Sequence, residues 1–191
     1  MKLTDCIGAY DNVLDKQTCE KLINTLESGK YQLLDQTSND YHEDSSIRIG
    51  TEMFLTHSDH ENLKSILLES TFNVLSLYRK QMTGMIDYIE NNFTSYKFEN
   101  YRIRRYEKGK GFFKLHSDIN DYNSASRLFV ILFYLNTVTK GGETDFPLLD
   151  TSVKPKRGSC AIFHPNFLFP HQANIPISHH KYTAQTYLHY K

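Results

Sequence analysis

Two stretches in the first half of the chain carry apolar residues at the three- and four-residue spacing of an amphipathic helix. The first covers 16–27, with Asp15 placed to cap its start and Gly29 to end it. The second follows a Ser-Asp pair at 58–59, either member of which fits as its cap, and ends near Gly84. The apolar faces consist of Cys19, Leu22, Ile23 and Leu26 in the first helix, and Leu63, Ile66, Leu67, Val74, Leu75 and Tyr78 in the second.

The segments around the second helix have weaker patterns. Polar, turn-forming residues at 35–46 predict a loop, and a short strand is expected from Ile47 to Phe54. The stretch 85–93 is ambiguous and fits a single helical turn.

From about Tyr96 the pattern changes to short runs rich in β-branched and aromatic residues, separated by Gly, Pro, Asn and Asp. Short strands at this spacing indicate a sandwich or a jelly roll. We therefore expect an α+β fold, a double-stranded β-helix (jelly roll) buttressed on one face by the N-terminal helices. The predicted strands lie around 98–106, 112–116, 127–135, 158–163 and 181–190.

Length and composition limit the organisation and the partners. A chain of 191 residues fits one domain over 1–191, with mainly helical support in 1–95 and the jelly-roll core in 96–191. Lys plus Arg and Asp plus Glu number 22 each, so the zero net charge gives no general reason to expect nucleic acid or an anionic membrane as partner. Three scattered cysteines do not resemble a disulfide framework. Without a signal-peptide pattern or an apolar run of about 20 residues, we expect a soluble, cytoplasmic monomer.

The chemistry of the chain is most visible at His116-Ser117-Asp118, at the end of a predicted strand. Residues i and i+2 of a strand point to the same face, so His116 and Asp118 can direct an imidazole and a carboxylate at one point. A third ligand from a distant strand would complete a facial triad of the kind that holds non-haem iron with open positions. The same tripeptide also occurs at 57–59, where it precedes a helix and fits a structural cap instead.

The residues around His116 form an ordered series of motifs. Tyr106-Glu107-Lys108-Gly109 precedes it, and Arg127 with Tyr134-Leu135-Asn136 follows. After these come Gly141-Gly142-Glu143-Thr144-Asp145-Phe146-Pro147, Pro155-x-x-Gly158 with Phe163, then His171 and Lys181. In this order, over about 100–190, the series resembles the prolyl 4-hydroxylase-like branch of the 2-oxoglutarate/Fe(II) dioxygenases.

The resemblance implies a site built on Fe(II), with 2-oxoglutarate and O₂ as co-substrates and ascorbate as a candidate reductant. It makes His116, Asp118 and His171 the iron ligands. His164 competes for the third position, but it directly follows a predicted strand end, whereas His171 lies ten residues before the basic residue as in the family.

The same resemblance implies that Lys181 pairs with the distal carboxylate of 2-oxoglutarate, because a buried carboxylate needs a charged partner. Tyr134 is a candidate phenol donor to that carboxylate, and Tyr106 a candidate pocket wall. Further candidates for the pocket are Arg127, His164 and Thr144.

Three functions stay open from the sequence. The first is hydroxylation of a prolyl residue in a protein or peptide, with release of succinate and CO₂. The second is the same chemistry on a free amino acid, another small molecule or a nucleobase. The third is a non-catalytic metal-binding jelly roll, which would have no use for Lys181. We expect substrate contacts from 30–60 and from the loop 119–126, since loops on a rigid scaffold usually carry specificity.

Overall fold

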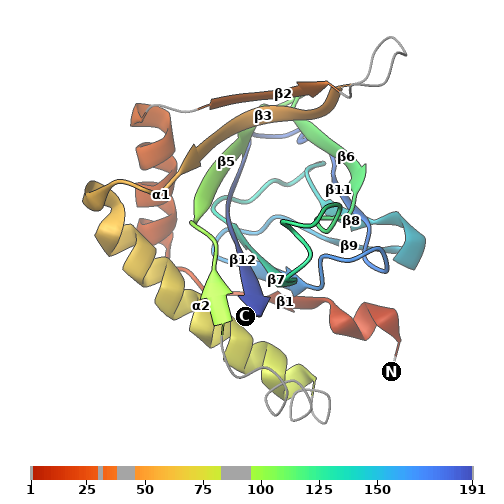
Figure 1. Ribbon diagram of the computed structural model, residues 1–191. Helices are drawn as coiled ribbons and strands as arrows, with labels where there is room; N and C mark the ends of the chain where they lie inside the picture. Colours follow the sequence, from red (N-terminus) through yellow and green to blue (C-terminus); the bar gives the residue numbers. More distant parts are fainter. Residues whose placement is uncertain (1, 30–31, 38–45, 83–95, 191) are drawn as a thin grey trace.

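The computed structural model describes residues 2–29, 32–37, 46–82 and 96–190. Within these ranges the chain forms a nearly closed antiparallel barrel of jelly-roll type with helices on one side (Figure 1). The fold class predicted from the sequence is confirmed. The elements in chain order are η1 (Leu3–Cys6), β1 (Gly8–Tyr10), α1 (Lys16–Ser28), β2 (Gln32–Thr37), β3 (Ser46–Phe54), η2 (Ser58–His60), α2 (Glu61–Gln81), β4 (Tyr96–Phe98), β5 (Arg102–Tyr106), β6 (Phe112–His116), β7 (Arg127–Tyr134), β8 (Thr144–Phe146), η3 (Pro147–Leu149), β9 (Thr151–Val153), β10 (Cys160–Phe163), β11 (His171–Ala173) and β12 (Lys181–Tyr190).

The strands follow the order β1-β10-β7-β12-β5-β3-β6-β11-β8-β9, with β2 paired to β3 and β4 paired to β12. Strand β3 therefore lies between β5 and β6, so the first half of the chain supplies part of the barrel as well as the helices. This insertion places residues near position 50 next to β5 and next to β6, the strand that ends at His116.

Both predicted helices form, with differences at their ends. The Asp15 side chain accepts a hydrogen bond of 2.7 Å from the Thr18 amide and caps α1 as predicted. The predicted cap at 58–59 is wrong, because these residues form the 3-10 turn η2 and α2 begins at Glu61 without a side-chain cap. Helix α2 ends at Gln81. The stretch 85–93, where a helical turn was expected, lies outside the described residues.

Two differences concern the strands. Strand β2 continues to Thr37, so the first three residues of the predicted loop at 35–46 belong to a strand. The predicted strand 98–106 is divided into β4 and β5, both of which pair with β12. Five very short or edge strands, β1, β2, β8, β9 and β11, were not predicted.

Strand β7 divides the core into two clusters. Phe129, Ile131 and Phe133 pack with the helices on one face of the sheet. Val130, Leu132 and Tyr134 face the inside of the barrel. A strand buried on both faces has no polar alternation, which explains the continuous apolar run in its sequence. None of the helices in the described ranges combines the length and apolarity needed to cross a membrane.

Gly158 joins the N-terminal segment to the barrel. Its carbonyl accepts hydrogen bonds from the amides of Val13 (2.8 Å) and Leu14 (3.0 Å). Its φ is +77°, and a Cβ at this position would lie 2.3 Å from the carbonyl oxygen of Leu14. Both the left-handed backbone and the close approach require glycine here.

We expect Gly158→Ala to lower the free energy of unfolding more than Gly109→Ala. Gly109 has a similar φ of +76° but no atom within 4 Å of the added Cβ, so it serves as a matched control for backbone strain alone. That strain costs about 1–2 kcal/mol, and overpacking against Leu14 adds roughly 1–3 kcal/mol. Urea denaturation of both variants measures the difference; equal losses would show that the contact with Leu14 contributes nothing.

Candidate metal centre

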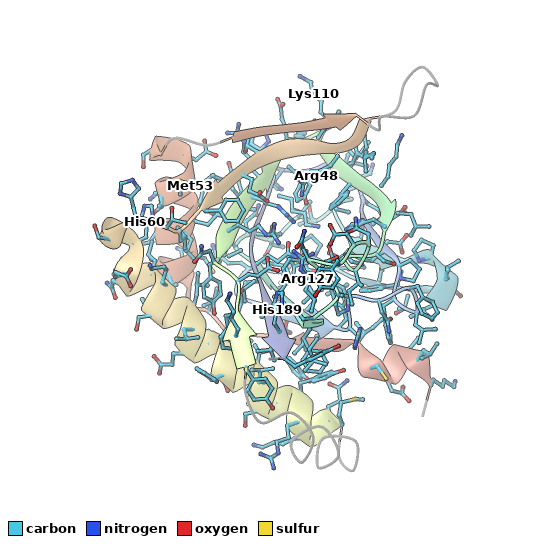
Figure 2. The ribbon with its side chains drawn as sticks, in the orientation of Figure 1. Arg48, Met53, His60, Lys110, Arg127 and His189 are labelled. Carbon is cyan, nitrogen blue, oxygen red and sulfur yellow. The ribbon has the colours of Figure 1, made fainter. Side chains whose placement is uncertain are left out.

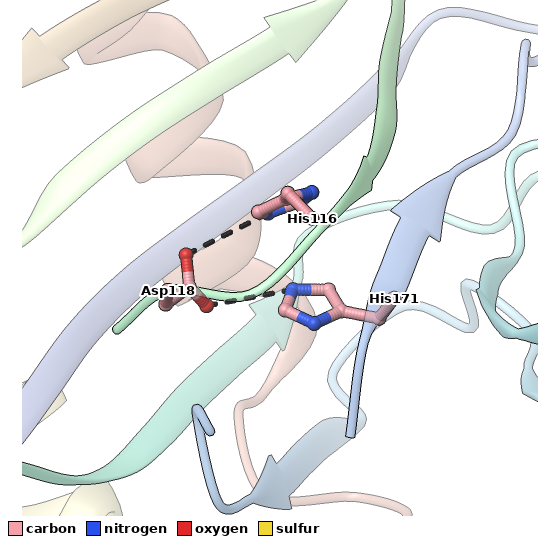
Figure 3. Close-up of side chains that lie close together, drawn as sticks. All are labelled: His116, Asp118 and His171. Atoms are coloured by element: carbon pink, nitrogen blue, oxygen red, sulfur yellow. Dashed lines mark ion pairs between the residues drawn. The ribbon is translucent and has the colours of Figure 1, made fainter. Parts of the chain in front are cut away.

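Three potential ligands meet where β6 and β11 pair inside the barrel (Figure 3). His116 ends β6, Asp118 follows two residues later, and His171 begins β11 directly opposite His116 in the register. One ligand atom from each residue lies within 4.8 Å of the others. The Nε2 atoms of His116 and His171 are 3.6 Å and 3.4 Å from the two carboxylate oxygens of Asp118.

Backbone carbonyls orient both imidazoles. Nδ1 of His116 lies 2.7 Å from the carbonyl oxygen of Lys114, and Nδ1 of His171 lies 3.2 Å from that of Phe169. A carbonyl can only accept, so each Nδ1 carries the proton and donates it. Each Nε2 therefore presents its lone pair toward Asp118, as an imidazole ligand must.

The ionisation states also suit a metal. Burial, together with the nearby His116 and Lys181 charges, lowers the pKa of His171 to about 4 despite the attraction of Asp118. Burial raises the pKa of Asp118, but the adjacent His116 and His171 side chains and the hydrogen bond from Tyr187 more than offset this and leave it below its usual range. At neutral pH the centre thus contains a neutral His171 and an ionised carboxylate, which are the metal-binding forms.

The two carboxylate oxygens of Asp118 have different surroundings. Oδ1 accepts a hydrogen bond of 2.7 Å from the phenol of Tyr187. Oδ2 is buried and has no hydrogen-bond partner among the described residues. A buried anionic oxygen without a partner is costly, and a cation at this point would satisfy it. The donor set and this orphaned oxygen therefore fit a divalent metal ion.

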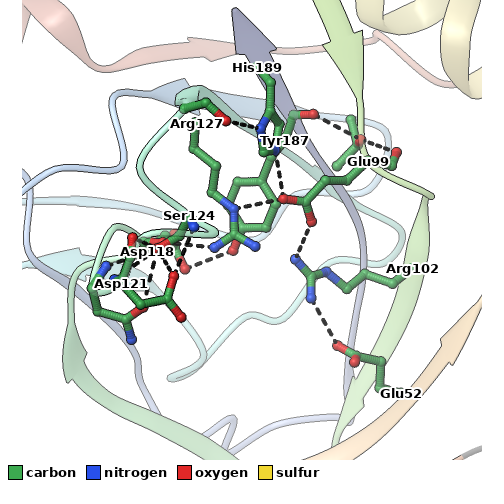
Figure 4. A network of polar contacts seen from close by, with 12 residues as sticks. Glu52, Glu99, Arg102, Asp118, Asp121, Ser124, Arg127, Tyr187 and His189 are labelled. Atoms are coloured by element: carbon green, nitrogen blue, oxygen red, sulfur yellow. Dashed lines mark hydrogen bonds and ion pairs between the residues drawn. The ribbon is translucent and has the colours of Figure 1, made fainter. Parts of the chain in front are cut away.

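A network of hydrogen bonds and ion pairs fixes the position of Asp118 through its backbone carbonyl and Oδ1 (Figure 4). Arg127 donates from Nη1 to the Asp118 carbonyl (2.7 Å) and from Nε to Glu99 (2.7 Å). Its guanidinium carbon also lies 3.8 Å from the centre of the Tyr187 ring. Arg127, a candidate for the pocket, directs its charge to Glu99 and to the backbone carbonyl of Asp118, and its place in a pocket stays a prediction.

The cavity next to the three ligands contains a buried cation, Lys181. This residue is only 1% exposed, and its Nζ lies 5.5 Å and 5.6 Å from the ring centres of Tyr106 and Tyr134. It has no ion pair within the part of the chain that the structure describes. Burial lowers the pKa of Lys181 to about 7, and the charge of Glu143 opposes this only in part.

The other residues predicted for the pocket line two different cavities, the one beside the three ligands and a second one. Tyr106 and Thr144 line it, and the Tyr134 phenol donates a hydrogen bond of 2.8 Å to the Thr144 hydroxyl. His164 lines a separate cavity beside Phe129 and is not a pocket residue of the metal centre. Its neighbour Phe163 points into the barrel, so the alternation of side chains along the strand turns His164 to the other side.

Sequence reasoning missed the polar residues of β5, the strand that pairs with β12 next to Lys181. Arg104 lines the cavity, donates from Nη1 to the Gln185 side chain at 2.6 Å, and forms an ion pair with Glu52 through Nε. Tyr187, which holds Asp118, was missed as well. The alternation of polar residues at 102, 104 and 106 could have indicated an inward polar face, but the partner Glu52 lies on a strand 52 residues earlier in the chain.

We expect Tyr187→Phe to weaken divalent metal binding by about 10- to 100-fold while the fold stays intact, since removing a hydrogen bond to a ligand has this effect on metal sites. Titration calorimetry with Mn(II) measures the change. Tyr182→Phe is the matched control, because this phenol is on the same strand but bonds outward to Glu27. Wild-type affinity in Tyr187→Phe would show that the bond to Oδ1 does not position Asp118.

Comparison with known proteins gives a consistent result. Residues 101–189 match the family model of the 2OG-Fe(II) oxygenase superfamily. A curated relative, the probable prolyl 4-hydroxylase 7 of Arabidopsis thaliana, is 26% identical over 85% of this chain, which spans about half (54%) of the length of that relative.

Solved structures share the fold. The viral collagen prolyl hydroxylase of Paramecium Bursaria Chlorella virus-1, in a 2OG complex, aligns with a TM-score of 0.72 and 21% identity over 97% of each chain. A Trichoplax adhaerens prolyl hydroxylase in complex with a hypoxia inducible factor peptide fragment aligns with a TM-score of 0.69 and 15% identity, over 97% of this chain and 84% of its own. The resemblance predicted from the sequence is thus confirmed: residues 101–189, which hold all three clustered ligands, are similar to the 2OG-Fe(II) oxygenase superfamily, and the chain has the fold of prolyl hydroxylases.

Proposed function

We propose that this protein is an Fe(II)- and 2-oxoglutarate-dependent dioxygenase. The observation that carries the proposal is Oδ2 of Asp118, which has no hydrogen-bond partner among the described residues and lies 3.4 Å from Nε2 of His171. The cavity beside it is lined by Lys181, which has no ion pair among the same residues. His116 and His171 would bind Fe(II) through Nε2, and Asp118 through Oδ2. Three ligands on one side leave the other coordination positions open for co-substrate and O₂.

Fe(II) with 2-oxoglutarate and O₂ supplies an oxidative decarboxylation to succinate and CO₂ that is coupled to hydroxylation of a substrate C–H bond. The chain's own residues bind, orient and exclude water. Tyr187 and Arg127 fix Asp118, while the apolar side chains of Val130, Leu132 and Phe163 cover the floor of the cavity.

Lys181 is the residue that we propose for the distal carboxylate of 2-oxoglutarate. Its burial without an ion pair among the described residues is unfavourable in the free protein, and a carboxylate would supply the missing charge. The Thr144 hydroxyl lines the same cavity, and the Tyr134 phenol is bonded to that hydroxyl, so Tyr134 acts through Thr144. Tyr106 forms the wall next to Lys181. A metal-binding module without catalysis would leave this buried lysine without a purpose.

For the substrate, we propose a prolyl residue in a protein or peptide. The support is indirect: one similar structure is described as a collagen prolyl hydroxylase, and another is described as bound to a peptide. Hydroxylation of a free amino acid, a small molecule or a nucleobase uses the same centre and is the alternative. The single domain over 1–191, the monomeric state, the cytoplasmic location and the use of ascorbate stay predictions from the sequence.

Anaerobic addition of Fe(II) and 2-oxoglutarate should produce a visible charge-transfer band that requires both additions, followed by succinate release on exposure to air. His171→Ala should abolish the band and reduce succinate by at least about 100-fold, because removal of a ligand leaves the metal poorly held. His164→Ala is the matched control, since His164 lies in a different cavity and should behave as wild type. A folded wild type without band or succinate would overturn the proposed function.

The affinity for 2-oxoglutarate should fall as pH rises above about 7. The pKa of Lys181 is about 7 in the free protein, so above that pH the amine is neutral and must take up a proton to pair with the carboxylate. The loss approaches tenfold for each pH unit. His171, with a pKa of about 4, does not titrate in this range.

Titration of the Mn(II)-loaded protein with 2-oxoglutarate at pH 6.5 and 8.5 tests this expectation. Lys181→Met should bind weakly at both values and lose the pH dependence. A wild-type affinity that is constant across this range would show that Lys181 does not pair with the co-substrate.

A further inference from the structure

The strands that flank β12, together with β3 beyond β5, carry more positive than negative charge on and near the inner face of the barrel. Four guanidinium groups lie on or next to the inner face of β3, β5 and the start of β7, and two carboxylates, Glu52 and Glu99, accompany them. Glu52 is shared by two of the arginines, and Glu99 by two arginines and His189. The arginines are Arg48, Arg102, Arg104 and Arg127.

Arg48 is the member of this group that lacks an ion pair among the described residues. It is 7% exposed, and its Nε is buried without a hydrogen-bond partner in the described part of the chain. Its guanidinium carbon lies 4.9 Å from the ring centre of Phe113, which stacks on His116 with ring centres 3.5 Å apart. Arg48 is therefore separated from a proposed iron ligand by a single aromatic ring, and it lies on the barrel side of β3 (Figure 2).

Arg104 is the arginine of this group that lines the cavity of the metal centre. It lines the cavity together with His116, Asp118 and His171. Its bonds to Glu52 and Gln185 use Nε and Nη1 and fix the plane of the guanidinium. Such a group is ordered before a ligand arrives, so little conformational entropy is lost when a carboxylate binds.

Fe(II) and 2-oxoglutarate do not supply the missing negative charge. In the loaded centre of the proposed function, the charges of Fe(II) and Lys181 are balanced by Asp118 and the two carboxylates of 2-oxoglutarate. The four arginines together with Glu52 and Glu99 keep an excess of about two positive charges, and buried charge of this kind requires a partner.

We propose that Arg104 and Arg48 bind a carboxylate of the substrate next to the iron centre, so that the hydroxylated molecule is acidic close to its target C–H bond. This inference rests on the proposed function and narrows its substrate class. The carboxylate has two sources in a peptide, an Asp or Glu side chain adjacent to the target residue, or the terminal α-carboxylate when the target is the last residue. A free amino acid offers the second.

The test measures binding to protein loaded with Mn(II) and 2-oxoglutarate, so that no turnover occurs. The probes are two pairs of short proline peptides: a capped Gly-Pro-Glu and its Gln counterpart, and Gly-Ala-Pro with a free or an amidated C-terminus. We expect the carboxylate member of at least one pair to bind at least about tenfold more tightly than its neutral counterpart. Which pair shows the preference identifies the source of the carboxylate.

Two variants and one control connect the preference to these arginines. Arg48→Gln removes a side chain without an ion pair in the described structure, and the double variant Arg104→Gln with Glu52→Gln removes both members of a buried pair, so that neither leaves an uncompensated carboxylate. Each should reduce the preference to less than about threefold without changing the affinity for the neutral peptide. Arg105→Gln, whose guanidinium faces outward to Glu27, should keep it.

Equal binding within both pairs, no detectable binding of either carboxylate peptide, or an unchanged preference in both variants would each overturn the inference. A protein that fails to load with Mn(II) and 2-oxoglutarate would instead overturn the proposed function, and this inference with it. Loading is measured first, so the two failures are distinguishable.

Discussion

The buried carboxylate of Asp118 is the group on which the interior of the barrel depends. One oxygen is held by Tyr187 and the main-chain carbonyl by Arg127, while the second oxygen has no partner among the described residues. A buried charge is tolerated only with hydrogen bonds and counter-charges around it. The network of Glu99, Arg127 and His189 provides them on one side, and the imidazoles of His116 and His171 define the direction left for a cation.

Strand β12 arranges most of the chemistry in this interior. Alternate residues of a strand face the same side, about 6.6 Å apart, so Lys181, Thr183, Gln185 and Tyr187 form one inward row. Lys181 lines the cavity at one end of the row, where we propose that 2-oxoglutarate binds. Gln185 accepts a hydrogen bond from Arg104, and Tyr187 donates one to Asp118. A one-residue shift of this strand would turn all four side chains outward, and its pairing with β5 on one side and β7 on the other fixes the register.

The sequence predicted those parts of the site whose geometry is local. The i, i+2 spacing of His116 and Asp118 and the order of motifs around Lys181 are short-range patterns, and the apolar run of β7 indicated the buried sheet. The pair of Arg104 with Glu52 could not be predicted, since the two residues meet only through the register of β3 and β5. The ion pair of Arg127 with Glu99 was not predicted for a related reason: Glu99 lies between β4 and β5, in a segment that was predicted as continuous strand.

The same residues that prepare the cavity for ligands weaken the free protein. Lys181 and Arg48 are buried against aromatic rings, and each gives up hydration that no ion pair among the described residues replaces. A ligand that binds only the folded state adds stability in proportion to the logarithm of its concentration over its dissociation constant. Co-substrate and acidic substrate would therefore each stabilise the folded barrel, because each neutralises one buried cation. The free protein is less stable because its cavity contains these cations before the ligands bind.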